Sequence, residues 1–295
     1  MTLSSKAAWG LVAALSLLLI ATLAGVVQGG PLDPSNPPGS TMKTLEEVEP
    51  RTPITSVPYT ISVSGAYYLT DSFTCASCGT QAISIAADDV TLDLNGFTLA
   101  CSGSCASTTG ILTTSAPKLV NIRNGTVRGF SIGILASPVV SSTFEDLKLY
   151  DNDNVGLWIE GENITVRRCV AQYNNRGVRF FSMPPDHVGG SILEDCSAVL
   201  NTTTGFEVSH RTEVRRNTAV DNGTTGIHIG GTQNNVHENY AANNTTGIYL
   251  ASSGNTSYRN AASGNGTNYL AFGGNTVGPI GTADTATSPW ANVTY

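Results

Sequence analysis

The chain has 295 residues, of which 13% are charged and 40% are hydrophobic, and its formal net charge at pH 7 is −7. Low charge with this apolar fraction excludes a disordered chain, which combines high charge with few core-forming residues. The acidic balance excludes a nucleic-acid-binding surface, because no basic face exists to neutralise phosphates. Abundant glycine (31), threonine (36) and asparagine (23) disfavour helices and indicate short strands joined by turns.

Residues 1–29 have the features of a secretory signal peptide. Lys6 precedes an uncharged apolar run from Ala7 to Leu32, and small residues suitable for cleavage occur at Ala24 and Gly29. The alternative is an uncleaved N-terminal anchor, since the run can span a bilayer at about 20 residues. We therefore expect a secreted or cell-surface protein that contacts a membrane only through this segment. Residues 30–58 are rich in proline and predict a linker or an early cap.

A repeat of about 21 to 23 residues organises the rest of the chain. A glycine followed by an apolar residue recurs at Gly110, Gly133, Gly156, Gly177, Gly205, Gly226 and Gly247. The intervals are 23, 23, 21, 28, 21 and 21 residues, and the long one contains an insertion at 182–190. Two columns of polar or cysteine residues recur in phase with these glycines: Asn124, Asp146, Cys169, Cys196, Asn217, Asn239 and Asn260, and then Asp151, Asn174, Asn201, Asn222, Asn243 and Asn265.

Such a short unit cannot bury its apolar face alone, so consecutive units must stack and share one core. Parallel coils at ~4.8 Å spacing place equivalent residues above one another, and stacked asparagines then bond to each other and to the turns. We interpret the glycines and asparagines as corner residues. The repeat predicts an all-β solenoid of stacked parallel coils over residues 59–295, capped by residues 59–80 and closed after Asn275. Trp290 is expected to pack as a plug, with a partner contact as the alternative.

Three further stretches resemble a known group of proteins. They are TMKTLEEVEPRTPI at 41–54, SGAYYLTDSF at 64–73 with ISIAADDVTLDLNGFTLACSG at 83–103, and SPWANVTY at 288–295. Together with the repeat, they resemble secreted bacterial members of the pectin-lyase-like superfamily. The resemblance implies a single-stranded right-handed parallel β-helix and assigns no particular reaction.

Four of the six cysteines form two neighbouring pairs. Export favours disulfides over a four-thiolate zinc site at Cys75, Cys78, Cys101 and Cys105. Equivalent cysteines are 26 and 27 residues apart, which suits bridges Cys75–Cys101 and Cys78–Cys105 between coils; local pairing within each loop is the alternative. Cys169 and Cys196 share a column and are expected to be buried, stacked thiols, although a bridge between them is possible in principle.

The second residue after each repeat glycine should point outward. This column reads Leu112, Leu135, Trp158, Arg179, Glu207, His228, Tyr249 and Leu270. Its central five residues span about 19 Å, enough for several sugar rings. We expect substrate binding by Trp158, Glu160, Asp186, His187, His210 and Tyr249, and in a catalytic version chemistry by Arg179, Glu207 and His228.

The column therefore predicts a monomeric protein that binds an extracellular polysaccharide and, as a lyase or hydrolase, cleaves it. The resemblance implies Ca²⁺ only for a lyase, in which carboxylates hold the ion and a basic residue removes a proton. No other cofactor or metal is indicated. Hydrolysis would pair Glu160 or Asp186 with Glu207. The alternative is a non-catalytic structural or adhesive surface protein.

Overall fold

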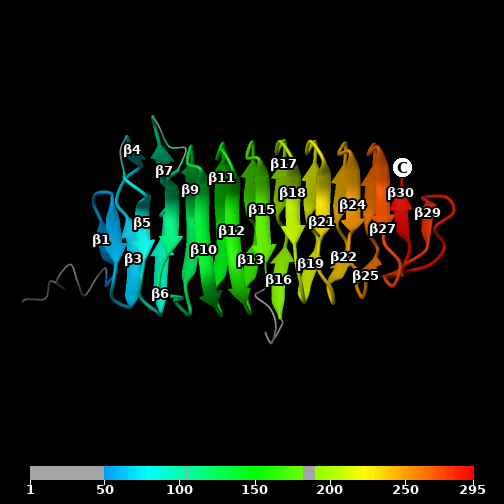
Figure 1. Cartoon of the computed structure of the whole chain (residues 1–295), viewed down its shortest axis with the longest axis horizontal. Helices are drawn as coiled ribbons and strands as arrows, with labels where there is room; N and C mark the ends of the chain where they lie inside the picture. The colour runs from blue at the N-terminus through cyan, green and yellow to red at the C-terminus, as the bar shows by residue number, and fades with distance from the viewer. Residues whose placement is uncertain (1–49, 77, 104, 106, 182–189) are drawn as a thin grey trace, which may run out of the picture. The chain divides into compact units, whose positions relative to one another are not determined.

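The structure is a computed structural model that describes residues 50–76, 78–103, 105, 107–181 and 190–295. Residues 51–295 form one compact unit, and its described residues contain strands and turns without helix. Figure 1 shows the coils of this unit stacked in chain order. Every strand pairing is parallel and joins a strand to its equivalent in a neighbouring coil, apart from the pairing of the last two strands with each other. This arrangement confirms the predicted solenoid.

One sheet, here called sheet B, contains ten strands in coil order. They are β2 (Tyr59–Ile61), β5 (Gln81–Ile85), β8 (Thr109–Thr113), β10 (Ile132–Val140), β12 (Val155–Glu162), β15 (Arg176–Phe181), β18 (Thr204–Val208), β21 (Thr225–Ile229), β24 (Thr246–Leu250) and β27 (Thr267–Ala271).

The other sheet, sheet A, has two rows of strands. The first row holds β1 (Thr52–Ile54), β3 (Gly65–Leu69), β6 (Val90–Asp93), β13 (Thr165–Arg167), β16 (Ser191–Glu194), β19 (Thr212–Arg215), β22 (Asn235–His237), β25 (Thr256–Tyr258) and β28 (Thr276–Val277). The second holds β4 (Phe73–Cys75), β7 (Thr98–Cys101), β14 (Val170–Gln172), β17 (Ser197–Val199), β20 (Thr218–Val220), β23 (Tyr240–Ala242), β26 (Ala261–Ser263), β29 (Ile280–Thr282) and β30 (Asn292–Thr294). The long strands β9 (Asn121–Arg128) and β11 (Thr143–Tyr150) run through both rows. β1 lies before residue 59, inside the segment expected to be a linker or an early cap.

The core lies between the sheets and is built by alternation along each strand. In β21, Ile227 and Ile229 are fully buried, while His228 between them reaches the surface. The repeat glycines are not corner residues: they lie within or directly beside the strands. A Cβ on any of the seven would lie 2.5–2.7 Å from a carbonyl oxygen of the next coil. Close approach of the coils, rather than turn geometry, therefore requires glycine there.

Asparagine ladders hold the corners of the coils, as predicted, but each of the two expected columns is displaced by one residue in two of its coils. The longest ladder is Asn152, Asn174, Asn201, Asn222, Asn244 and Asn265. Asp151 and Asn243, which the sequence suggested, precede true members and have left-handed φ angles of 53° and 55°. A second ladder, Asn217, Asn239, Asn260 and Asn292, continues the Cys169–Cys196 column, and a third joins Asn234, Asn255 and Asn275. Asn124 and Asp146 likewise lie one residue before the second column, whose places in their coils are Gly125 and Leu147.

Two neighbouring columns of alternating charge, here called the charge lattice, cover part of sheet A. One column reads Asp93, Arg123, Glu145, Arg167, Glu194 and Arg215, and the other reads Asp146, Arg168, Asp195, Arg216, Glu238 and Arg259. Glu194 is representative, because its Oε2 lies 2.8 Å from Arg215 and 2.7 Å from Arg216. The lattice satisfies its own charges and ties each coil to the next.

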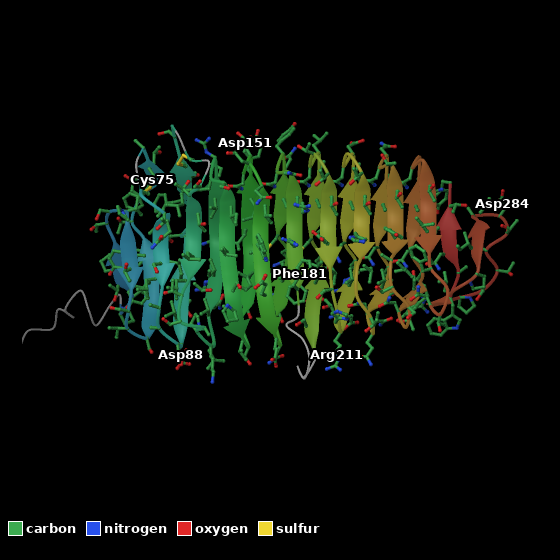
Figure 2. The ribbon with its side chains drawn as sticks, in the orientation of Figure 1. Cys75, Asp88, Asp151, Phe181, Arg211 and Asp284 are labelled. Atoms are coloured by element: carbon green, nitrogen blue, oxygen red, sulfur yellow. A yellow bond between two sulfur atoms is a disulfide. The ribbon has the colours of Figure 1, made fainter. Side chains whose placement is uncertain are left out.

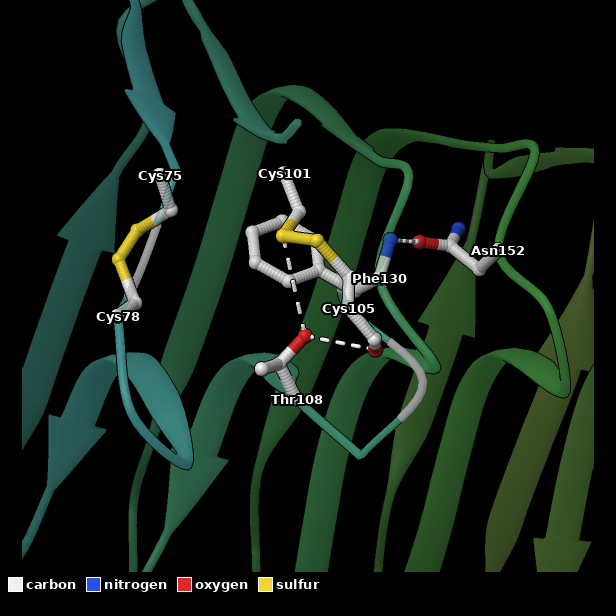
Figure 3. The surroundings of a disulfide bond; sticks show 7 residues. All are labelled: Cys75, Cys78, Cys101, Cys105, Thr108, Phe130 and Asn152. Atoms are coloured by element: carbon white, nitrogen blue, oxygen red, sulfur yellow. Dashed lines mark hydrogen bonds between the residues drawn. A yellow bond between two sulfur atoms is a disulfide. The ribbon is translucent and has the colours of Figure 1, made fainter. Parts of the chain in front are cut away.

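Local pairing corrects the expected disulfide connectivity. Cys75 pairs with Cys78 and Cys101 with Cys105, with Cα atoms 5.4 Å and 6.4 Å apart (Figure 3). Cys75 and Cys101 are register partners on β4 and β7. Side chains in register on parallel strands stay ~4.8 Å apart, whereas a disulfide requires Cβ atoms to converge to ~3.8 Å.

Cys169 and Cys196 are buried free thiols, as expected. The Cys169 backbone N–H donates to the Cys196 sulfur at 3.4 Å, and burial raises the pKa of the Cys196 thiol. They therefore occupy the asparagine positions of their coils, and Cys196 accepts the backbone hydrogen bond that an asparagine oxygen accepts in the ladder.

The expectation that Trp290 plugs the C-terminal end is wrong. Its side chain is 53% exposed, lies edge-to-face against Tyr258 at 5.3 Å, and is covered by the Arg259 guanidinium at 4.8 Å. Closure after Asn275 is made on sheet A, where β28 pairs with β25 and β30 pairs with β26. Within the described ranges, no helix is long and apolar enough to cross a membrane. The N-terminal segment 1–49 lies outside those ranges.

Candidate functional site

The strand register confirms the outward column of sheet B. Residue by residue, the pairings join Leu112, Leu135, Trp158, Arg179, Glu207, His228, Tyr249 and Leu270 on eight consecutive strands from β8 to β27. From β8 to β24, each of these side chains stands between two buried neighbours on its strand, so alternation directs it away from the core. The five central residues, Trp158 to Tyr249, are here called the central column.

Arg179 is held between two aromatic rings. Its guanidinium carbon lies 4.3 Å from the ring centroid of Trp158 and 4.5 Å from that of Phe181. Its Nε is 3.4 Å from Glu207 Oε2, and Arg176 Nε approaches the same oxygen at 3.3 Å. Two arginines therefore share one carboxylate, which leaves a local excess of positive charge. Phe181, labelled in Figure 2, lies near the middle of the stack of coils.

Arg176 and Phe181 were missed in the sequence. Arg176 lies directly before a repeat glycine, in the position that Thr204, Thr225 and Thr246 occupy in later coils. That break in a threonine column is the signal that could have identified it. Phe181 continues the strand two residues beyond Arg179, at the border of the insertion.

Glu160 is turned away from Glu207. Its carboxylate accepts a hydrogen bond from Trp158 Nε1 at 3.1 Å and another from the Ser137 hydroxyl of the preceding coil. Glu207 lies two coils in the opposite direction, and the register places the two Cα atoms about 12 Å apart. The two carboxylates do not face each other as a hydrolytic pair would.

The C-terminal half of the central column is aromatic. The rings of His228 and Tyr249 stack with centroids 5.1 Å apart, and Tyr249 contacts Phe272 at 6.0 Å. Burial lowers the pKa of His228 below its ordinary value of 6.5, and the nearby Glu207 carboxylate only partly opposes this. The imidazole is therefore neutral at pH 7 and can accept a proton.

A neighbouring column, two residues further along each strand, is bulky only at its ends. Backbone hydrogen bonds continue the register from Phe181 through Ser209, Gly230 and Ala251 to Phe272. The short side chains lie beside Glu207, His228 and Tyr249. Phe181 and Phe272 thus bound a strip in which the residues directly beside Glu207, His228 and Tyr249 in this column are small.

Of the remaining expected site residues, only His210 is described, and it is not brought into the central column. His210 lies in the turn after β18, where its Nδ1 accepts the Thr232 backbone N–H at 2.9 Å. Asp186 and His187 belong to residues 182–189, which lie outside the described residues. Among the residues that are described, no group of three or more histidine, cysteine, aspartate or glutamate side chains could hold a metal ion.

Comparisons with known proteins agree with this architecture. The Dettilon tailspike protein has a TM-score of 0.59 and 14% identity, with 83% of this chain and 51% of the tailspike covered. The chain thus spans about half the length of that protein. A mannuronan C-5 epimerase A-module of Azotobacter vinelandii gives a TM-score of 0.41 and 15% identity, with 83% of this chain and 88% of the module covered. For a pectate lyase, the TM-score is 0.46 and the identity is 17%, with 77% of this chain and 70% of the lyase covered.

These identities are low, so the structural similarities concern the fold alone, and of these three structures only the tailspike has a TM-score above one half. No curated protein sequence matches the chain. The sequence pattern of the right handed beta helix region matches residues 59–211 and 109–265. Because these matches cover well over half of the chain, the protein belongs to the right-handed parallel β-helix family, as the resemblance to the pectin-lyase-like superfamily implied.

Proposed function

We propose that this β-helix binds an extracellular polysaccharide along the central column. The observation that carries the proposal is the continuity of the column: Trp158, Arg179, Glu207, His228 and Tyr249 are register partners on five consecutive coils. Arg179 contacts Trp158 and Glu207, and His228 stacks on Tyr249. At ~4.8 Å per coil, they extend over about 19 Å, the length of several sugar rings. The fold does not require this composition, because leucine occupies the same column in the flanking coils.

The chemistry of the column suits a sugar chain. Trp158 and Tyr249 offer flat apolar surfaces near its two ends, and Glu207 and His228 offer hydrogen-bonding groups between them. Arg179 is already fixed by the two rings and by Glu207, so binding would freeze few additional side-chain rotamers. An acidic sugar would gain from the shared excess charge of Arg176 and Arg179.

A panel of neutral and uronate-containing polysaccharides, each with and without Ca²⁺, tests the proposal by calorimetry and affinity electrophoresis. Trp158→Ala and Tyr249→Ala should each weaken binding about tenfold or more. Leu112→Ala, in the same column three coils before Arg179, is the matched control and should leave affinity unchanged. If no polysaccharide binds, the protein is a structural or adhesive β-helix instead. If polysaccharide binds but the variants and the control behave alike, the central column is not the binding site.

A catalytic version has one specific observation in its favour, the neutral imidazole of His228. In a lyase, His228 would accept the proton next to a uronic carboxylate, Arg179 would bind that carboxylate, and Glu207 would orient Arg179. Ca²⁺ belongs to this version only, as an added carboxylate-binding ion. Unsaturated products should then form with wild-type protein and be lost in His228→Gln. Binding without products would leave the binding proposal standing and exclude the lyase.

A further inference from the structure

A second cluster of exposed side chains lies on the second row of sheet A, next to the corner held by the Asn152–Asn174–Asn201 ladder. Three of its large apolar side chains, Tyr150, Val170 and Tyr173, are 39%, 38% and 46% exposed. They come from two consecutive coils, because β11 and β14 pair with Tyr150 opposite Gln172. Asp151, which follows Tyr150, lies at the rim of the stack in Figure 2, away from the edge that carries Asp88 and Arg211.

This cluster encloses a shallow cavity of about 120 Å³. Its walls are Thr126, Lys148, Leu149, Tyr150, Val170 and Gln172. The Tyr150 and Tyr173 rings meet edge-to-face with centroids 5.4 Å apart. The cavity thus combines apolar side chains, the Tyr150 ring and three kinds of hydrogen-bonding group, and Tyr173 lies against that ring beside it. This is the composition expected of a small-ligand site.

The cations at this cavity differ from those of the charge lattice. Arg167, Arg168, Arg215 and Arg216 each contact a carboxylate within 3.0 Å. In the part of the chain that the structure describes, neither Lys148 nor Arg128 lies within ion-pairing distance of a carboxylate. Register places Arg128 beside Tyr150 and Lys148 beside Val170. Two uncompensated positive charges therefore flank the rings, on a chain whose net charge is −7.

The backbone at Tyr173 is a further departure from the pattern of the other coils. Its φ is +58°, in the left-handed region. The equivalent corner position is Gly129, Asp151, Asp221, Asn243 or Gly264 in other coils, all residue types that adopt this region more easily. Only Tyr173 and the exposed Leu200 break this pattern among the described coils from Gly129 to Gly264. A bulky ring is thus exposed in a conformation that disfavours it.

We propose that Arg128, Lys148, Tyr150, Gln172 and Tyr173 form a second binding site, for an acidic sugar. The sugar ring lies against the two tyrosines, its carboxylate or sulfate is bound by Lys148 and Arg128, and Gln172 bonds to a hydroxyl. The site is on a different sheet from the central column and does not rest on the function proposed for it.

The test uses full-length protein and calorimetry with two probes of equal length, a hexamer of galacturonic acid and a neutral hexamer of glucose. Trp158→Ala first disables the central column. In that background, Lys148→Gln and Tyr173→Asn should each weaken binding of the acidic hexamer about tenfold, the effect of one charge-assisted contact or one ring. Tyr240→Asn, another tyrosine 39% exposed in the same column as Lys148 and Val170, is the matched control.

Tyr173→Asn also separates binding from folding. Because asparagine adopts a left-handed φ more easily than tyrosine, this variant should melt at the wild-type temperature or above it while losing affinity. The proposal is overturned if the Trp158→Ala protein does not bind the acidic hexamer, binds the neutral hexamer equally well, or is unaffected by both patch variants. If the patch variants abolish binding and Trp158→Ala alone has no effect, the central column fails and this site stands.

Discussion

Adjacent asparagines in one corner give the sharpest test of how the coils are held together. Asn244 is 4% exposed, and its Nδ2 donates to the Ala219, Ala242 and Asn265 oxygens at 3.0, 2.9 and 2.9 Å. Asn243, one residue earlier, is exposed at φ 55°, and no hydrogen bond joins its side chain to another described residue. The same substitution, Asn→Asp, therefore removes a ladder member at one position and alters only surface charge at the other.

Asn244→Asp replaces an amide NH2, whose two N–H groups are shared among three acceptors, with an oxygen that faces the same acceptors. At about 1 kcal/mol per lost hydrogen bond, with an added penalty for the opposed oxygens, the free energy of unfolding should fall by roughly 3–5 kcal/mol. For a domain of this size, that corresponds to a decrease in melting temperature of about 10 °C. Asn243→Asp should change it by less than about 2 °C, because aspartate already occupies the equivalent position at Asp221.

Thermal and urea unfolding of both variants, followed by circular dichroism, measures the difference. In Asn244→Asp, burial disfavours the charged form of the introduced carboxyl group, so acidification should protonate it and restore a donor. The deficit of Asn244→Asp should therefore shrink between pH 7 and about pH 4. Equal stability of the two variants, or a deficit independent of pH, would refute the assignment of the ladder to Asn244.

Three further predictions concern charge and sulfur. The hydrogen bonds from Arg168 and Arg216 lower the pKa values of Asp146 and Asp195 below 3.8. The stability that these two carboxylates contribute is therefore present above pH 3.8 and is lost as the pH falls through the folded pKa values. The double Asp→Asn variant should have a flatter acid-unfolding profile. Burial lowers the pKa of His228 below 6.5, so stability should begin to fall below pH 6.5 and level off below the folded pKa, and His228→Gln should abolish that step in urea titrations. Cys75→Ser should leave the Cys101–Cys105 bridge intact in non-reducing peptide maps and cost less than about 2 kcal/mol, because the closed loop is short.

The repeat could be predicted from the sequence because the coil spacing directly shapes composition. Equivalent residues recur after one coil, so Gly226 and Gly247 are 21 residues apart. Their backbones lie so close together that a side chain on Gly226 would collide with the Gly247 carbonyl oxygen. The one-residue error at Asn243 and Asn244 has a local cause. Both residues of such a pair suit a corner, one through its left-handed backbone and the other through its ladder hydrogen bonds, and the spacing alone does not distinguish them.

The charge lattice shows a signal that was present in the sequence and was not recognised. The dipeptides Glu145-Asp146, Arg167-Arg168, Glu194-Asp195 and Arg215-Arg216 alternate in sign from coil to coil. Each pair of like charges is unfavourable alone and becomes favourable only once the neighbouring coil places the opposite pair beside it. The expected disulfide connectivity was wrong although the register was right: side chains in register on parallel strands stay too far apart for their Cβ atoms to converge, so each cysteine pairs within its own loop.

The central column could be predicted because the fold leaves it free. The coils are held together by hydrophobic burial and close glycine contacts in the core, by asparagine ladders at the corners and by the charge lattice on sheet A. Among the described coils, stacking therefore does not require particular residue types on the outward face of sheet B. A residue type there that departs from the flanking leucines is consequently more informative than a charge on sheet A, which has a partner in the next coil. The same reasoning identifies Lys148 and Tyr173 on sheet A, because they are positions at which the local structural rule, a paired charge or a small corner residue, is broken.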